Sequence, residues 1–428
     1  MVFILGKKTT SLLVVWLLIS LSFTSLGTNI DKNINNVEQV AKTSYEEQDL
    51  VLLHGEFYLT LDALESVDSF NVKYVFPLDY QFQVPILLYL LNDSTADILD
   101  YKIQTDDDGL NKIVNFTIGH MEKNEKSKIH FSAWALVKNE KFEDLPSNVK
   151  IPTKEELPED TKQWLVSTEV VQVDHPLIKL RAKLLRGFTD NIITLVKRVA
   201  KFTCNHKWIL FYLECKLNFW FSQDALTTLL LSGDCPGKSH LGCALLRANG
   251  VPARVIYGVP ANTGWYASHS MVEYYVPGYG WVFSELPQGY ITYEPITRLI
   301  LRISFPWEEN DTINYSRSER VIGLHRWYWI GNENITSGVI GSMMHNTLEN
   351  EIVTDPVTAN ETFNLTRTVY ILYEYYQQMD LEGDNLIHFQ NAVSYQKEAV
   401  FELTDSDNLF DYTSFLEKAK YEYKQIIL

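Results

Sequence analysis

The chain has 428 residues, 46% of them hydrophobic, and a formal net charge of −17. At about 100 to 200 residues per domain, this length predicts two or three domains with ordinary hydrophobic cores. The acidic balance argues against binding to a nucleic-acid backbone, which requires clustered Lys and Arg, so we expect no nucleic-acid partner.

The N-terminus has the layout of a secretory signal peptide. Lys7 and Lys8 precede an apolar run over residues 12–23, and Gly27 supplies a small residue for cleavage. This pattern predicts a signal peptide over residues 1–27, with an uncleaved membrane anchor as the alternative, because about 20 apolar residues span a bilayer. We therefore expect a secreted or extracytoplasmic protein, with contact to the cell envelope or surface left open.

Residues 45–145 predict an antiparallel β-sandwich. Short runs rich in β-branched and aromatic residues alternate with turn residues; the runs are VLLHGEFYLTL, VKYVFPL, FQVPILLYLL, ILDYKIQT, KIVNFTIG and KIHFSAWALV. The turn from Asp106 to Asp108 is acidic, but it lacks the spaced ligands of a calcium-binding loop. A polar stretch with three prolines, LPSNVKIPTKEELPED, then predicts a linker.

Beyond the linker the hydrophobic period becomes helical. Apolar residues recur three and four apart in HPLIKLRAKLLRGFTDNIITLVKRVAKF, and the apolar run WILFYLECKLNFWF is too short to span a membrane. The stretch GDCPGKSHLGCALLRANGVPARVIYG predicts a helix that begins at Cys235 and ends near Gly250, followed by a strand. The segment HSMVEYYVPGYGWVFSEL predicts a hairpin that turns at Pro277 and Gly278.

Cys235 lies where a helix N-terminus favours an anion, which predicts a free, partly accessible thiol with a lowered pKa. A disulfide is an alternative in an exported chain. Cys243 is about 12 Å further along the same helix, beyond disulfide reach, so any bridge is expected between Cys204 and Cys215. A zinc site is a third interpretation, with Cys204, His206, Cys235, His240 and Cys243 as ligands. Against it, Cys235 and His240 would lie about 140° apart around the helix.

A nucleophile needs a base and an orienting acceptor, and both occur downstream. His269 opens one predicted strand, and Glu285 lies in the next. In this order, the blocks GDC, LGCALLRANGVPARVIYGV and HSMVEYYVPGYGWVFSELP resemble the transglutaminase-like superfamily over residues 233–287. The upstream helices and the β-rich segment are similar, more loosely, to exported bacterial and archaeal members. The resemblance does not reach residues 301–428, which we expect to be a mixed, largely helical region of unknown role.

The resemblance implies a papain-like α+β core over about residues 150–300. It implies a catalytic triad with Cys235 as nucleophile, His269 as base and Glu285 as orienting acid, and acyl transfer from a peptide or isopeptide amide to water or an amine through a thioester. It implies neither a cofactor nor a metal. Two residues depart from the family pattern, which has Asp at the acid position and Trp where this chain has Met271. A non-catalytic surface or interaction protein that retains the fold is therefore the alternative.

The register of the predicted hairpin decides whether Glu285 can reach His269. A turn centred on Pro277 places residues His269 and Glu285 opposite each other, and a bulge near Gly280 would shift the pairing by one residue, which the longer arm of Glu compensates. We therefore predict that Glu285 is a working acid. Gln223, upstream of the nucleophile, is a candidate second oxyanion donor.

Other residues of the motif have structural interpretations. We expect Arg247 and Arg254 to make ion pairs or helix-end contacts. Tyr275 and Trp281 are expected to pack on the sheet, and His240 is expected to be exposed on its helix.

Overall fold

The computed structural model describes residues 49–139, 142, 144–206, 222–263, 268–294, 296–310, 327–405 and 408–427. The predicted signal peptide and the apolar run over residues 208–221 lie outside these residues. The chain divides into two compact units. Of the described residues, the first unit contains Pro146–Ala253 and Tyr274–Tyr293, and the second contains 49–145, Arg254–Glu273 and 294–427.

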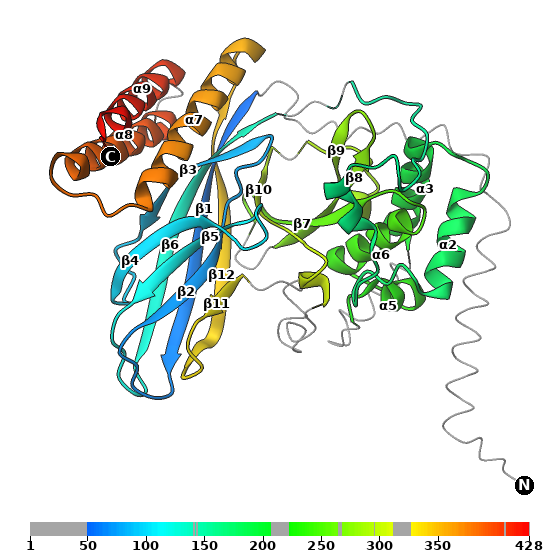
Figure 1. Ribbon diagram of the computed structural model, residues 1–428, viewed down its shortest axis with the longest axis horizontal. Coiled ribbons are helices and arrows are strands. Elements are labelled where there is room, and N and C mark those ends of the chain that lie inside the picture. Colours follow the sequence, from blue (N-terminus) through cyan, green and yellow to red (C-terminus); the bar gives the residue numbers. More distant parts are fainter. Residues whose placement is uncertain are drawn as a thin grey trace, which may run out of the picture. The chain divides into compact units, whose positions relative to one another are not determined.

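The second unit contains two four-stranded antiparallel sheets, with strand orders β12-β1-β6-β3 and β11-β2-β5-β4 (Figure 1). All six runs predicted as strands are confirmed: β1 Leu50–Ala63, β2 Phe70–Phe76, β3 Gln83–Leu90, β4 Ile98–Thr105, β5 Lys112–Ile118 and β6 Lys126–Lys138. The remaining two strands, β11 Tyr328–Ile330 and β12 Ile335–Ile352, come from the C-terminal third.

Aromatic side chains of the two sheets meet in one hydrophobic core. Phe57 on β1 and Tyr74 on β2 contact each other edge to face, with ring centroids 5.8 Å apart. Phe116 on β5 and Phe131 on β6 lie 5.3 Å apart. All four side chains are fully buried, and edge-to-face pairs add to the stability gained from burial alone.

Strand β12 pairs with β1 along its whole length, from Leu50 opposite Ile352 to Ala63 opposite Ile335. The structure therefore differs from the predicted boundaries, which separate residues 45–145 from residues 301–428. A pairing between strands so far apart in the chain leaves no mark in local hydrophobic periodicity, which reports only each strand's own face.

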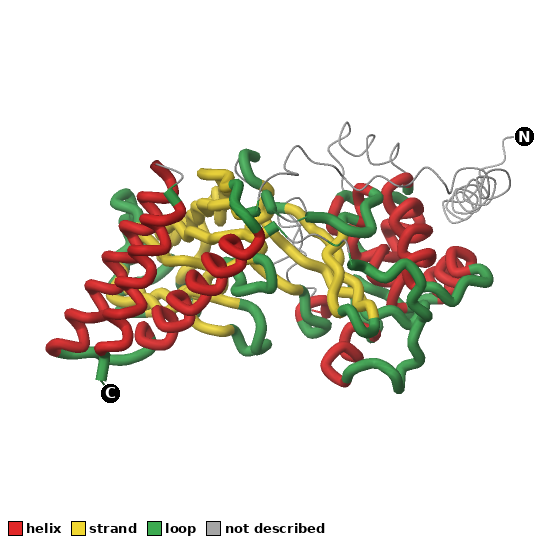
Figure 2. Tube along the Cα trace, turned by 90° about the horizontal axis from the view of Figure 1, so that it is seen from above, coloured by secondary structure: helices red, strands yellow, loops and turns green. Residues whose placement is uncertain are grey.

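Three helices end the second unit and run side by side: α7 Pro356–Gln377, α8 Gly383–Asp405 and α9 Leu409–Gln425 (Figure 2). Arg367 on α7 forms an ion pair with Asp79, with 2.8 Å between Nε and Oδ1. Gln396 on α8 donates to the carbonyl oxygen of Ile86 at 2.9 Å. The helical expectation for the C-terminal region is confirmed here, beside the two additional strands. Within the described residues, no helix has the length and apolar character needed to cross a bilayer.

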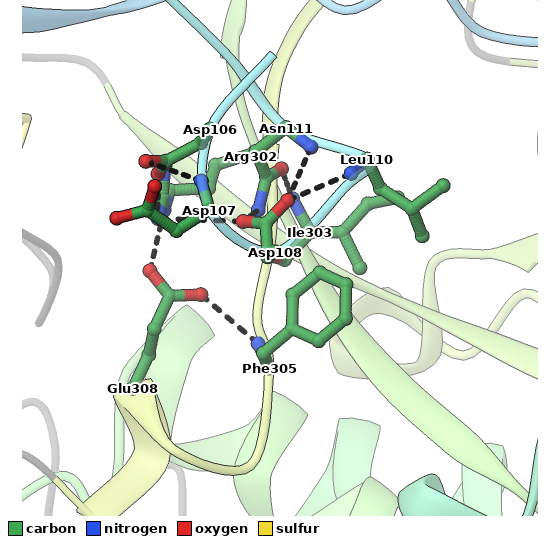
Figure 3. A network of polar contacts seen from close by, with 9 residues as sticks. All are labelled: Asp106, Asp107, Asp108, Leu110, Asn111, Arg302, Ile303, Phe305 and Glu308. Carbon is green, nitrogen blue, oxygen red and sulfur yellow. Dashed lines mark hydrogen bonds and ion pairs between the residues drawn. The ribbon is translucent and has the colours of Figure 1, made fainter.

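Arg302, on strand β10 (Arg298–Ile303), is fully buried among three carboxylates of the second unit (Figure 3). Its guanidinium lies 2.9 Å from Asp106 Oδ2, 3.7 Å from Asp108 Oδ2 and 2.5 Å from Glu308 Oε1. The acidic turn of the sequence is thus the partner of an arginine. Burial raises the pKa of Glu308 to about 7, although the positive charge of Arg302 opposes this shift.

A second buried cluster of this unit joins Arg254 on β7 (Ala253–Pro260) to Glu273 on β8 (His269–Val276). Arg254 Nε donates to Glu273 Oε2 at 2.7 Å, and the Tyr80 hydroxyl donates to the same carboxylate at 2.6 Å. The structural interpretation of Arg254 is confirmed. Strands β7 and β8 are neighbours in a third sheet of order β10-β7-β8-β9.

The first unit is mainly helical around one buried helix. Its elements are a 3-10 helix η2 Glu159–Leu165, the helices α2 Pro176–Arg186, α3 Ile192–Asn205, α5 Ala225–Leu230 and α6 Cys235–Arg247, strand β9 Gly280–Ser284 and the short 3-10 helix η3 Leu286–Gln288. Helices α2, α3 and α5 and the η3 turn all contact α6. As a result, almost every residue of α6 after its first is buried.

Two expected packing roles are confirmed in this unit. Arg247 Nε, at the end of α6, donates to the carbonyl oxygen of Ala253 at 2.8 Å, a helix-end contact. Trp281 on β9 packs edge to face against Tyr275 on β8 and against Trp164, with ring centroids 5.6 Å and 5.2 Å apart.

Candidate active site

Cys235 is the first residue of α6, as the sequence predicts, and the helix ends three residues before Gly250, whose φ is +86°. The residue before it, Asp234, caps the helix: its carboxylate Oδ1 accepts the backbone N–H of Cys235 at 2.8 Å. Cys235 is a free cysteine and the residue is half-buried, which confirms the prediction of a free thiol. Cys204 is also a free thiol, and its suggested partner Cys215 lies outside the described residues.

The predicted lowering of the Cys235 pKa is wrong for this structure. Burial raises the pKa of the thiol, and the negative charges of Asp234 and Glu285 raise it further, while Lys238 opposes them. A helix N-terminus stabilises an anion by about 0.3–1 kcal/mol, whereas burial can shift a pKa by up to about 3–5 units, each equal to about 1.4 kcal/mol. The larger effect decides, so the thiol keeps its proton until a base removes it.

Glu285 is fully buried and directly follows strand β9. Its backbone N–H donates to the carbonyl oxygen of Tyr290 at 3.1 Å, and its own carbonyl accepts from Gly289 at 3.0 Å. The next residue, Leu286, accepts a hydrogen bond from the Thr203 hydroxyl on α3 at 2.9 Å. The backbone around Glu285 is therefore fixed to α3, a helix that contacts α6. From this position the negative charge of Glu285 acts on the Cys235 thiol.

His269 is the first residue of strand β8 and is half-buried. It falls in the second unit, whereas Cys235 and Glu285 fall in the first. The predicted turn at Pro277 and Gly278 is confirmed, because Tyr279 N–H donates to the carbonyl oxygen of Val276 at 3.0 Å and Gly278 has a φ of +77°. The pairing of residues 269 and 285 stays a prediction.

Gln223 lies against the first turn of α6. Its side-chain Oε1 accepts the backbone N–H of Asp234 at 2.8 Å, and the side chain is 2% exposed. A Cβ atom at Gly237 would lie 2.7 Å from this oxygen, so glycine is what allows the carboxamide to approach the helix. Because Oε1 is the acceptor, the NH₂ end of the carboxamide is a donor beside the nucleophile's turn.

The two histidines of the zinc interpretation have structural roles. His240 is 1% exposed, because neighbouring helices enclose α6, so the expectation that it is exposed is wrong. Its Nδ1–H donates to the Gln223 carbonyl at 2.7 Å. His206 Nε2 lies 2.9 Å from the carbonyl oxygen of Thr228 and 3.0 Å from that of Leu229. Within the part of the chain that the structure describes, no group of three or more His, Cys, Asp or Glu side chains is arranged to hold a metal ion.

Asp234 is the site residue whose role the sequence reasoning missed. The sequence presents it as half of a Gly-Asp turn before the nucleophile. The available signal was its position, because Asp immediately before a helix is a preferred N-cap residue. Here that cap accepts the N–H of the reactive residue itself.

The family model described as the transglutaminase-like superfamily matches residues 179–285. No curated protein matches the chain. Among solved structures, a "putative cysteine protease" from Cytophaga hutchinsonii is 17% identical, with 72% of this chain and 92% of that chain covered and a TM-score of 0.48. A "putative protease" from Parabacteroides distasonis is 15% identical with a TM-score of 0.22; the match covers 53% of this chain and 42% of that chain, less than half of its length. Cys235, His269 and Glu285 all fall within the matched residues, and residues 179–285 form a transglutaminase-like domain.

Proposed function

We propose that this protein is a cysteine-dependent enzyme that cleaves or transfers the acyl group of peptide or isopeptide amides. The observation that carries the proposal is the position of Cys235, which begins the buried helix α6 of a transglutaminase-like domain, with the Glu285 carboxylate close enough for its charge to act on the thiol. The proposed substrate is a protein or peptide, and the domain is proposed to have the papain-like arrangement of helix and sheet.

The proposed reaction forms and then resolves a thioester. His269 takes the proton from the Cys235 thiol as sulfur attacks the amide carbonyl carbon, and the electron pair of the carbonyl moves onto its oxygen. When the C–O double bond re-forms, the C–N bond breaks and the amine leaves with the proton from His269. Water or an amine then attacks the thioester and regenerates the thiol. Glu285 is proposed to orient the His269 ring.

The raised pKa of Cys235 supports a reaction in which thiol deprotonation and attack are coupled to His269. The developing oxyanion needs donors, and we propose two: the backbone N–H of Cys235 and the carboxamide NH₂ of Gln223, whose Oε1 accepts from the neighbouring Asp234. A single preorganised donor of this kind contributes about 10²–10³ in kcat.

A thioester adduct at Cys235 would test the proposed function. The protein is incubated with a library of quenched fluorescent peptides and isopeptides, and the acid-quenched protein is examined by mass spectrometry for a hydroxylamine-sensitive adduct on the peptide that contains Cys235. Cys235→Ala is expected to abolish turnover and adduct, and Cys204→Ala, which changes another partly accessible thiol, is expected to retain both. Equal turnover by the wild type and Cys235→Ala would overturn the proposal.

The residue at position 271 favours a second candidate, a non-catalytic surface or interaction protein that retains the fold. Met271 is fully buried in β8, where the family pattern has Trp. This candidate predicts no turnover and no adduct, but unchanged binding of a protein ligand by Cys235→Ala. Retained binding together with turnover that depends on Cys235 would exclude it.

We also propose that the chain is exported, from the signal-peptide pattern of residues 1–27. Expression with and without these residues, followed by cell fractionation and N-terminal sequencing of the mature chain, tests it. A full-length chain that stays in the cytoplasm with its N-terminus intact would contradict export, and an uncleaved chain in the membrane fraction would identify an anchor.

A further inference from the structure

The carboxylate of Asp234 accepts a hydrogen bond from the backbone N–H of Cys235, which the proposed reaction needs as an oxyanion donor. Oδ1 accepts the N–H of Cys235 at 2.8 Å. This N–H belongs to the reactive residue itself, and it is one of the helix N–H groups that have no partner within the helix. A substrate oxyanion would use the same donor, and it too carries negative charge.

Two hydrogen bonds hold the backbone of the residue that carries this carboxylate. The backbone N–H of Asp234 donates to Gln223 Oε1 at 2.8 Å, and its carbonyl oxygen accepts the N–H of Lys238 at 2.9 Å as the first bond of the helix. The backbone of Asp234 is therefore held at both ends. Only rotation of its side chain can release the N–H of Cys235.

The charges that act on the thiol come from three groups. Asp234 and Lys238 lie on the same turn as Cys235, and Glu285 follows β9. Both carboxylates disfavour the thiolate, and Lys238, whose Nζ donates to the Cys204 carbonyl at 3.0 Å, opposes them. Asp234 also hydrogen-bonds to the reactive residue.

We propose that Asp234 is a positioning residue that keeps the nucleophile unreactive until substrate binds. In the free protein its carboxylate fills the oxyanion position and disfavours the thiolate. A substrate carbonyl that enters the site displaces the carboxylate from the Cys235 N–H. The displacement opens the oxyanion position and moves the negative charge that disfavours the thiolate. This inference rests on the proposed function, because the displaced position matters only if an acyl group reacts there.

Alkylation of Cys235 tests this role without a substrate. Iodoacetamide rates are measured for the full chain at several pH values between 6.5 and 8.5, and modification is assigned to Cys235 by peptide mass mapping. Asp234→Asn and Asp234→Ser keep a capping side chain but remove the charge. If neutralisation lowers the thiol pKa by about one unit, the thiolate fraction rises about tenfold and its nucleophilicity falls about threefold, so alkylation should be about threefold faster.

Asp224→Asn is the matched control. Asp224 caps the neighbouring helix α5 through a hydrogen bond to the Thr227 N–H at 2.8 Å, so this variant neutralises a cap in the same unit without changing the turn of Cys235. Its alkylation rate should equal that of the wild type. Unchanged or slower alkylation in both folded Asp234 variants would overturn the inference, even if Cys235-dependent turnover is found. Faster alkylation without any turnover would support the restraint on the thiol and count against the proposed function.

Discussion

Glu285 has two opposite effects on Cys235 under the proposed mechanism. As a buried negative charge near the thiol it disfavours the thiolate, and as a partner of His269 it would favour the proton transfer that forms the thiolate. The two effects can be separated, because alkylation of the free protein reports the first and turnover reports the second.

We therefore predict that Glu285→Gln accelerates alkylation of Cys235 while it lowers kcat/KM by about a hundredfold or more, since general-base catalysis contributes about 10²–10⁴. Glu285→Asp keeps the charge and should retain far more activity than Glu285→Gln. Steady-state kinetics and alkylation rates on the same preparations measure both. Equal kcat/KM for the Gln and Asp variants would show that the carboxylate does not orient the base.

At the scale of elements, the hairpin of β8 and β9 carries two of the three proposed catalytic residues, one at its start and one just past its end. Its turn depends on Gly278, whose φ of +77° is strained for residues with a side chain. Gly109, in the turn between β4 and β5, has a φ of +78°, and in both turns an added Cβ would meet no atom within 4 Å. The two glycines therefore differ only in what their turns position.

Gly278→Ala and Gly109→Ala are each expected to cost about 1–2 kcal/mol of folding free energy through backbone strain alone. Only Gly278→Ala should also lower turnover, because it changes the hairpin that holds His269 and Glu285. Urea unfolding gives the first quantity and peptide kinetics the second. Activity that falls equally in the two variants would mean that stability, not hairpin geometry, limits turnover.

Local patterns in the sequence were sufficient for the elements but not for their partners. The six strand runs, the turn at Pro277 and Gly278 and the helix that starts at Cys235 follow from periodicity, turn residues and capping, which act within a few residues. The burial of His240, and the burial that raises the pKa of Cys235, depend on the elements that pack around α6, and the charge of Glu285 adds to that of the neighbouring Asp234. No periodicity reports such contacts, so the direction of the thiol pKa shift could not be predicted.

At the scale of the whole molecule, the chain is acidic and one of its buried clusters is acidic as well. Arg302 faces the carboxyl groups of Asp106, Asp108 and Glu308, so the cluster sets three carboxyl groups against one guanidinium. The pKa of about 7 for Glu308 means that the folded protein retains a proton there that the unfolded chain, with a pKa near 4.5, releases.

Stability should therefore decline as the pH rises from about 4.5 to 7, by up to about 3 kcal/mol from this group. Glu308→Gln, which is neutral at every pH, should remove this part of the pH dependence. Asp107→Asn, an exposed neighbour in the same acidic turn, is the control and should retain it. Urea unfolding at pH 5 and pH 7.5 measures the differences; identical pH dependence in the wild type and Glu308→Gln would refute the assignment.

The pairing of β1 with β12 has a consequence for the time course of folding. Leu50 is synthesised about 300 residues before its partner Ile352, and at about 5–20 residues per second this interval lasts roughly 15–60 s. During that time β6 can pair with one edge of β1, while the backbone N–H and C=O groups of the other edge have no partner strand on the ribosome. The nascent chain is thus most prone to wrong association before its last quarter emerges, and refolding of the complete chain, in which both strands are present from the start, avoids that interval.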